Sequence, residues 1–171
     1  KKGDRVAICM ANNPEYIISF MAITSMGAVC VLLNSWWVPS EVLYGLEHSQ
    51  SKLIFGDLKR LQGLESIDIT KIVSSYTPDE TFTDFKDFID GKSEEWPNID
   101  ISRDDNVTIY YTSGSTGKPK GVLSSQRGLI SSMFSWAFMG SVLSEREKRL
   151  GKDSTSLIET DSSILLCVPL F

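Results

Sequence analysis

Histidine is nearly absent from this sequence and cysteine is scarce. The 171 residues contain one histidine, His48, and three widely separated cysteines that lie in apolar runs: Cys9, Cys30 and Cys167. A single histidine and the lack of CxxC spacing argue against a zinc site built from side chains. An odd number of cysteines, each in an apolar run and without CxxC spacing, is typical of buried thiols in a reducing compartment. We therefore expect a cytoplasmic protein without a disulfide framework.

The sequence also lacks long apolar runs and an excess of positive charge. Apolar stretches such as residues 29–33 and 164–171 are far shorter than the roughly 20 residues that span a bilayer. The formal net charge of −5 argues against nucleic-acid partners, because phosphates are neutralised by clustered Lys and Arg. Ten acidic and three basic residues lie within residues 79–105, which we interpret as solvated surface. We expect no transmembrane segment, and peripheral membrane association stays open.

What the sequence does contain is an alternation of strand and helix signals. Short apolar runs of strand length occur at residues 5–10, 29–33, 52–55 and 71–74. Between them, Asn13 and the following proline begin a helical pattern that ends at Gly27, and Ser40 can cap a second helix that runs to about His48. Residues 29–33 are apolar throughout, as in a parallel strand covered on both faces. This alternation predicts an α/β fold with mostly parallel β-sheets flanked by helices.

The second half of the sequence predicts a further part of the same kind of fold. Phenylalanine spacing predicts a short helix over residues 81–89, strands are expected at 107–111 and 121–125, and a helix at 128–143. We expect a charged insertion at 144–160 and a last strand at 164–168. The domain prediction is therefore an α/β lobe at 1–95, an acidic connection at 96–106, and the start of a second lobe at 107–171. The sequence ends in an apolar run without a cap or a polar tail, and this predicts that the chain is truncated at its C-terminus.

The stretch YTSGSTGKPKGV, residues 111–122, is the main functional candidate. It is either a flexible linker or a loop that binds phosphate. Linkers are normally flanked by polar sequence, whereas this stretch lies between two expected strands. Glycines let backbone N–H groups approach an anion, hydroxyl groups add donors, and two lysines add positive charge. This combination favours phosphate binding, with a structural or linker role as the alternative.

The spacing of this loop differs from that of the usual P-loop. The P-loop pattern GxxxxGK[ST] leads into a helix, but here Gly114 and Gly117 are too close together and Pro119 follows Lys118. Proline favours an extended conformation for the residue before it. We therefore expect a strand–loop–strand hairpin.

The same motif resembles the phosphate-loop signature of the AMP-forming acyl-CoA synthetases, within the adenylate-forming superfamily. The resemblance extends to GDRVAICMANNPEYIISFMAITSMGAVCVLLN at residues 3–34, to NSWWVPSEVLYGLEHSQSKLIFGD at 34–57, and to ILLCVPLF at 164–171. The adjacent Trp36 and Trp37 make this stretch similar to the sequences of fatty-acyl-CoA ligases in particular. The acidic segment and residues 144–160 fall outside the resemblance.

The resemblance implies an enzyme that uses ATP, Mg²⁺ and coenzyme A. A carboxylate, expected to be a fatty acid, attacks the α-phosphate of ATP to give an acyl-adenylate and pyrophosphate, and a thiol then displaces AMP. The loop is implied to hold the β- and γ-phosphates, with Thr116 near the metal. The implied phosphate-binding residues are Thr112, Ser113, Gly114, Ser115, Thr116, Gly117, Lys118 and Lys120.

Several features limit which functional roles can be transferred from the family to residues of this chain. Many family members have His where this chain has Gln126, so no role of that His is transferred. The family's adenylation lysine, adenine motifs and metal-binding glutamate are expected downstream, so no catalytic residue is predicted within the chain. Alternatives are an amino-acid adenylation or luciferase-like enzyme, a non-catalytic ATP-binding α/β module, and a truncated chain that self-associates. The acyl chain length cannot be read from these residues.

Three other features have a simpler interpretation beside a functional one. Trp36 and Trp37 are expected to pack in a turn rather than contact a ligand. His48 is expected near a helix end, where it favours the helix dipole. The apolar run at 133–143 is expected to pack in the core, with an acyl pocket as the alternative.

Overall fold

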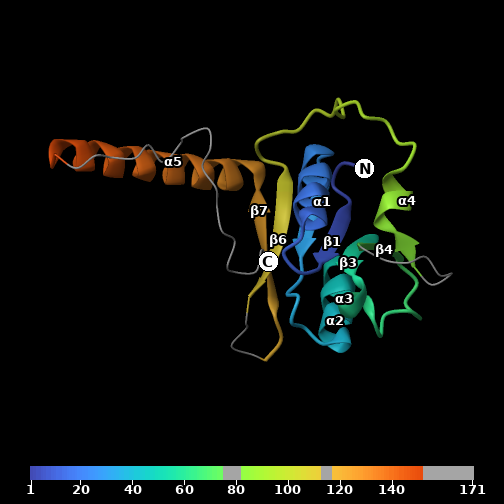
Figure 1. Cartoon of the computed structure of the whole chain (residues 1–171). Coiled ribbons are helices and arrows are strands. Elements are labelled where there is room, and N and C mark those ends of the chain that lie inside the picture. The colour runs from blue at the N-terminus through green and yellow to red at the C-terminus, as the bar shows by residue number, and fades with distance from the viewer. Residues whose placement is uncertain (75–81, 113–116, 152–171) are drawn as a thin grey trace.

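The computed structural model describes residues 1–74, 82–112 and 117–151, which form one seven-stranded sheet with helices on both faces (Figure 1). The strand order is β5-β4-β3-β1-β2-β6-β7. Every neighbouring pair is parallel except β6 and β7, which are antiparallel. The predicted α/β class with a mostly parallel sheet is confirmed.

Most helices and strands follow the order expected from the sequence, but helix α3 and strand β5 were not predicted. The strands are β1 Arg5–Cys9, β2 Val29–Leu32, β3 Leu53–Asp57, β4 Thr70–Ser74, β5 Thr83–Asp84, β6 Asn106–Thr112 and β7 Lys120–Ser125. The helices are α1 Pro14–Ser25, α2 Pro39–Ser49, α3 Leu58–Leu61, α4 Phe85–Ile89 and α5 Gln126–Arg149.

Two hydrophobic clusters, one on each face of the sheet, hold these layers together. One cluster contains Val42 of α2 and Leu61 of α3, and the other contains Ile23 of α1 and Phe85 of α4. Strand residues alternate between the two clusters, as the two-residue period of a strand requires. All four residues of β2 are buried, which confirms the parallel central strand expected from its continuous apolar run.

The helix starts show which local signals were decisive. The side chain of Asn13 accepts a hydrogen bond of 3.0 Å from the backbone N–H of Tyr16, so α1 begins as predicted. The expected cap at Ser40 is wrong, because α2 begins at Pro39. Proline has no N–H to satisfy at the first helical position, and the Glu41 carboxylate accepts a bond of 3.0 Å from the Val38 N–H.

The segment after β4 contains less helix than predicted. The helix expected over residues 81–89 begins only at Phe85, because Thr83–Asp84 pair with β4 as strand β5. The Asp84 side chain then accepts a hydrogen bond of 2.8 Å from the N–H of Lys86. Phe85 packs edge-on against Phe55 of β3 with ring centroids 5.9 Å apart, so the expected packing on the core is confirmed.

The acidic connection at 96–106 joins two parts of one sheet. Strand β6 lies parallel to β2, with Cys30 opposite Thr108, although the sequence predicts that 1–95 and 107–171 form separate lobes. The buried strand β2 needs a neighbour on each side, and β6 supplies the second one. The domain boundary of the whole protein therefore stays a prediction.

The last described helix is longer than expected and projects from the rest of the molecule (Figure 1). It begins at Gln126, where the Ser125 hydroxyl accepts a bond of 3.3 Å from the N–H of Gly128, and ends at Arg149. The insertion expected from residue 144 thus begins inside a helix. The strand expected at 164–168 lies outside the described residues. The apolar run at 133–143 is exposed among the described residues, so the expected core packing is not seen there.

Candidate functional site

The predicted strand–loop–strand hairpin is present, with strands β6 and β7 on either side of the candidate loop. Tyr111 lies opposite Gly121 and Thr112 opposite Lys120 in the antiparallel ladder. A Cβ atom on Gly121 would come within 3.1 Å of Ile109 Cγ2, so a residue without a side chain lets the strands pair closely. The hairpin thus fixes the two ends of the loop relative to the sheet.

The structure describes half of the predicted phosphate-binding residues. Thr112, Gly117, Lys118 and Lys120 are placed and exposed. The remaining four, including the proposed metal ligand, lie outside the described residues: Ser113, Gly114, Ser115 and Thr116. The set therefore stays a prediction, with its first and last residues brought together by the hairpin.

Gly117 and the two lysines have the properties that an anion-binding turn needs. Gly117 has a φ of +84°, a left-handed conformation that residues with a Cβ rarely adopt. Within the described part of the chain, neither Lys118 nor Lys120 forms an ion pair with a carboxylate. Among the described residues, two ammonium groups thus lie at the end of the loop without a carboxylate partner.

Helix α2 contacts both ends of the loop. The Tyr44 hydroxyl donates a hydrogen bond of 3.1 Å to the Pro119 carbonyl, and Lys118 Nζ lies 5.5 Å from the centroid of the Tyr44 ring. The Tyr111 hydroxyl lies 3.2 Å from the Gly45 carbonyl oxygen and 2.9 Å from His48 Nδ1. The helix that follows β2 therefore supports the loop that follows β6.

A small cavity of about 260 Å³ lies between this helix and the loop. It is lined by Asn34, Trp37, Glu41, Tyr111, Thr112, Gly117 and Pro119. The loop and the residues after β2 both lie at the carboxyl ends of their parallel strands. Ligands of open α/β sheets bind at this edge, so the position of the cavity agrees with a ligand site at the loop.

His48 and Trp37 were placed from the sequence, but their contacts with Tyr111 were missed, and Tyr44 was missed altogether. His48 does lie in the last turn of α2, but its ring also contacts Tyr111, with centroids 5.7 Å apart. Trp37 packs edge-on against Tyr111 at 5.4 Å, whereas the Trp36 side chain is 72% exposed. The four-residue spacing of Tyr44 and His48 on one helix face was the available signal, because such residues are neighbours.

The cysteines that the structure describes are core residues. Cys9 and Cys30 are fully buried. Burial raises the pKa of the Cys9 thiol to about 12, and burial likewise raises the pKa of Cys30. Both therefore remain protonated near neutral pH and are poor nucleophiles. Cys167 lies outside the described residues.

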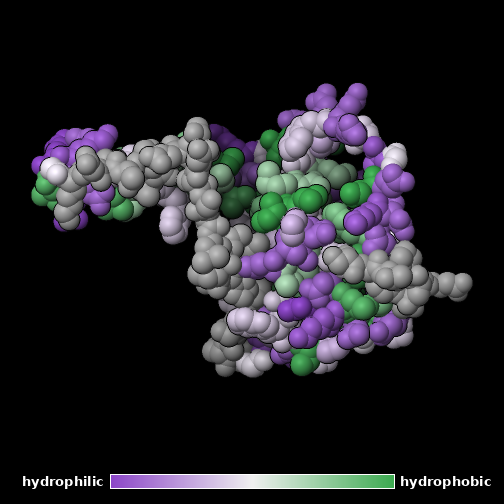
Figure 2. All heavy atoms as spheres, viewed as in Figure 1, coloured by the Kyte–Doolittle hydropathy of each residue, from purple (hydrophilic) through white to green (hydrophobic). Residues whose placement is uncertain are grey.

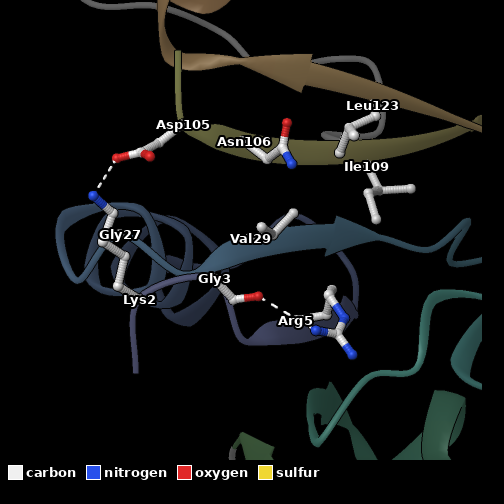
Figure 3. A pocket seen from close by; sticks show the side chains of 9 residues that line it. All are labelled: Lys2, Gly3, Arg5, Gly27, Val29, Asp105, Asn106, Ile109 and Leu123. Carbon is white, nitrogen blue, oxygen red and sulfur yellow. Dashed lines mark hydrogen bonds and ion pairs between the residues drawn. The ribbon is translucent and has the colours of Figure 1, made fainter. Parts of the chain in front are cut away.

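A second cavity, of about 340 Å³, lies at the amino ends of β1 and β2 (Figure 3). Lys2 Nζ lies 2.6 Å from the carboxylate of Asp105. The Arg5 guanidinium donates to the backbone carbonyls of Ser49 and Gln50, at 3.0 and 3.1 Å. Because the side chains of Lys2 and Arg5 already have protein partners, we assign no anion site to this cavity.

The described residues hold neither a cluster of metal-binding side chains nor a membrane-spanning helix. No group of three His, Cys, Asp or Glu side chains that could hold a metal ion occurs among residues 1–74, 82–112 and 117–151. In the same ranges, no helix is both long and apolar enough to cross a membrane.

Solved structures that share this fold define its class. An anthranilate CoA ligase in complex with anthranoyl-AMP matches 74% of this chain and 26% of its own length, with a TM-score of 0.69 and 26% sequence identity. A fatty acyl CoA synthetase of Mycobacterium tuberculosis matches 80% of this chain and 27% of its own length, with a TM-score of 0.65 and 26% identity. The fold is thus that of the N-terminal domains of adenylate-forming enzymes.

The chain matches the AMP-binding enzyme family over residues 1–171, and it belongs to that family. A 4-coumarate–CoA ligase of Humulus lupulus is 28% identical over 178 residues, covering 100% of this chain and 30% of the ligase. A 3-hydroxybenzoate/4-hydroxybenzoate–CoA ligase of Thauera aromatica is 30% identical over 136 residues, covering 75% of this chain and 26% of the ligase. The chain therefore spans less than a third of the length of these relatives.

Proposed function

We propose that this chain supplies the ATP phosphate-binding loop of an AMP-forming acyl-CoA synthetase. In the proposed reaction a carboxylate oxygen bonds to the α-phosphorus of ATP and the bond to the pyrophosphate oxygen breaks. The thiol of coenzyme A then attacks the acyl carbon and AMP leaves. The carrying observation is the β6–β7 hairpin, which brings Thr112 and Lys120 together at the ends of a loop that contains the exposed Lys118. Family membership supports the same conclusion.

The loop residues would act mainly on the leaving group. Negative charge increases on pyrophosphate as the bond to the α-phosphorus breaks, and donors already in place stabilise that charge without reorganisation. Lys118 and Lys120 would supply positive charge, while Thr112 and the backbone N–H at Gly117 would donate hydrogen bonds. The adenylation lysine and the adenine contacts would come from other parts of the protein, so we propose no catalytic residue in this chain.

Magnesium fits the chemistry of the proposed site. Mg²⁺ binds few protein oxygens and several phosphate oxygens, and its charge would offset that of the β- and γ-phosphates. We propose the Thr116 hydroxyl as the protein group nearest the metal. The two exposed lysines and the left-handed Gly117 favour a polyphosphate at this position.

A fatty acid is our proposed carboxylate, and an aromatic acid is the main alternative. The paired Trp36 and Trp37 and the matching mycobacterial fatty acyl CoA synthetase favour a fatty acid. The hydroxycinnamate and hydroxybenzoate ligases among the relatives favour an aromatic acid. An amino-acid adenylation enzyme, a luciferase-like enzyme and a non-catalytic ATP-binding module remain as further candidates. We propose a cytoplasmic location and small-molecule partners only, without nucleic acid.

The test is calorimetric titration of the chain with magnesium pyrophosphate, followed by the same titration of the Lys120→Ala variant. A hydrogen bond to a charged group contributes about 1.5–3 kcal/mol, so Lys120→Ala should weaken binding by roughly 10- to 100-fold. Lys92→Ala is the matched control, because Lys92 is an exposed lysine in the acidic segment. Equal affinities of the Lys120→Ala and Lys92→Ala variants would remove the loop from the proposal.

A further inference from the structure

One face of α2 contacts the chain at both ends of the phosphate-binding loop. Tyr44 and His48 lie one turn apart on this face and stack with ring centroids 5.4 Å apart. Tyr44 reaches Lys118 and Pro119 at the end of the loop, while His48 reaches Tyr111, just before its start. Two stacked side chains on a rigid helix therefore touch both arms of the hairpin at the point where the loop leaves it.

One arrangement of protons satisfies both contacts of the Tyr111 hydroxyl. Tyr111 has one hydroxyl proton, and the Gly45 carbonyl, 3.2 Å away, can only accept. When that proton goes to Gly45, a proton on His48 Nδ1, 2.9 Å away, is donated to the Tyr111 oxygen, and we infer this tautomer for His48 because it satisfies both contacts. Burial raises the pKa of the Tyr111 hydroxyl, which keeps this donor protonated.

The Tyr44 side chain makes two separate contacts with the other arm. Its hydroxyl donates to the Pro119 carbonyl at 3.1 Å, which fixes the backbone directly before Lys120. Its ring faces the ammonium group of Lys118 at 5.5 Å, within the range of a cation–π interaction. The residue thus holds both the backbone and one of the two cations of the loop.

We propose that Tyr44 and His48 are positioning residues that hold the phosphate-binding loop for a di- or triphosphate, His48 acting through Tyr111. Tyr44 acts on Lys118 and Pro119, and His48 acts on Tyr111. This inference rests on the proposed function of the loop. It adds a role for α2, which would set the distance between the two ends of the loop before ligand binds.

The experiment combines magnesium pyrophosphate affinity with hydrogen–deuterium exchange of the peptide covering residues 117–121. Tyr44→Phe removes the hydroxyl and keeps the ring, so we expect faster exchange in this peptide and affinity reduced about 3- to 10-fold, as for one lost neutral hydrogen bond. Tyr110→Phe is the matched control, because Tyr110 packs against the core cluster on the opposite sheet face. It should leave both measurements unchanged.

Substitutions of His48 separate a positioning role from a merely structural one. Asn can place an N–H group near the position of Nδ1, whereas Leu cannot, so His48→Asn should retain and His48→Leu should lose both affinity and exchange protection. The nitrogen NMR spectrum of the wild-type chain should show a protonated Nδ1 at His48. Equal behaviour of His48→Asn and His48→Leu, or an unprotonated Nδ1, would overturn the assignment to His48.

The two readouts distinguish failure of this inference from failure of the proposed function. If the wild-type chain does not bind pyrophosphate, the function proposed for the loop fails. Faster exchange in Tyr44→Phe would then still support the contact as the one that holds the loop. Unchanged exchange in both Tyr44→Phe and His48→Leu would overturn the inference, whatever the wild-type affinity is.

Discussion

At the scale of single residues, Gly117 determines the backbone conformation where the chain leaves the loop. Its φ of +84° places its N–H in a direction that an alanine would reach only with strain. No atom of the described residues lies within 4 Å of the position of a Cβ there. The requirement for glycine is therefore conformational rather than steric, which makes it directly testable.

We expect Gly117→Ala to weaken magnesium pyrophosphate binding at least several-fold, because left-handed backbone costs alanine about 1–2 kcal/mol. Gly91→Ala is a matched control, since Gly91 has a φ of +64° and equally open surroundings. Both variants should lose a similar, small amount of stability in urea unfolding. Equal pyrophosphate affinities of the two variants would contradict a role for the Gly117 conformation in binding.

The buried thiols predict how stability depends on pH. The pKa of Cys9 is raised by burial from 9.0 to about 12, and the pKa of Cys30 is raised by the same cause. The folded chain therefore keeps protons that the unfolded chain loses above pH 9, so stability should fall as pH rises from about 9 to 12. Urea unfolding at several pH values measures this, and a Cys9→Ala/Cys30→Ala variant should show a smaller decline.

At the scale of helices and strands, the approach of α2 to the sheet depends on Gly45. A Cβ atom there would come within 2.7 Å of Leu33 Cδ2 and 3.0 Å of Trp37 Cζ3. The absence of a side chain thus lets the helix pack closely enough for its Gly45 carbonyl to receive the Tyr111 hydroxyl. The close packing of α2 on the sheet and its contact with Tyr111 before the loop therefore both depend on Gly45.

We expect Gly45→Ala to lower the free energy of unfolding by about 1–3 kcal/mol, because extra volume in a packed contact is destabilising. Gly128→Ala in α5 is the opposite control, since a Cβ there meets only Ser125 Oγ at 3.7 Å. That variant should gain about 0.5–1 kcal/mol from helix propensity. Denaturant titration of both variants checks the signs, and a neutral or stabilising Gly45→Ala would contradict close packing of α2.

Local signals predicted much of this architecture, and long-range contacts account for the rest. Asn13 with the following proline gave the start of α1, and the apolar run of β2 gave a central parallel strand. The hairpin followed from strands on both sides of the glycine-rich loop. The contact of α2 with the hairpin joins Tyr44 to Pro119, and residues so far apart leave no periodic pattern in the sequence. Strand β5 was missed because its two residues, Thr83 and Asp84, are too few to show an alternating pattern.

At the scale of the whole molecule, large apolar side chains are exposed on α5 and over α1. Figure 2 shows apolar side chains gathered on the surface over α1, where Ile17, Ile18 and Met21 are each about half exposed. On α5 the Trp136 side chain is 82% exposed and Phe134 is 71% exposed. Exposed apolar area of this kind favours association.

We expect the chain to self-associate as its concentration rises, measured by light scattering coupled to gel filtration. Replacing Phe134 and Trp136 by Ser should reduce association without lowering the melting temperature, since neither side chain is buried. A melting temperature that falls sharply in this variant would show instead that these side chains are packed.

We also expect the 171-residue chain alone to form no acyl-CoA from ATP, fatty acid and coenzyme A, because it spans less than a third of its relatives. Thioester formation is followed by chromatography with a complete ligase as positive control. Measurable product would contradict the proposal that catalytic groups lie in other parts of the protein.

The position of β6 beside β2 has a consequence for the order of folding. Strands β1 to β4 each find a partner close by along the chain, whereas β6 reaches β2 only after the whole region from α2 to α4 has been passed. Contacts between distant residues form slowly, because a long loop must close first. The phosphate-binding hairpin is therefore expected to dock against β2 late during refolding, and pyrophosphate affinity should recover after the helices do.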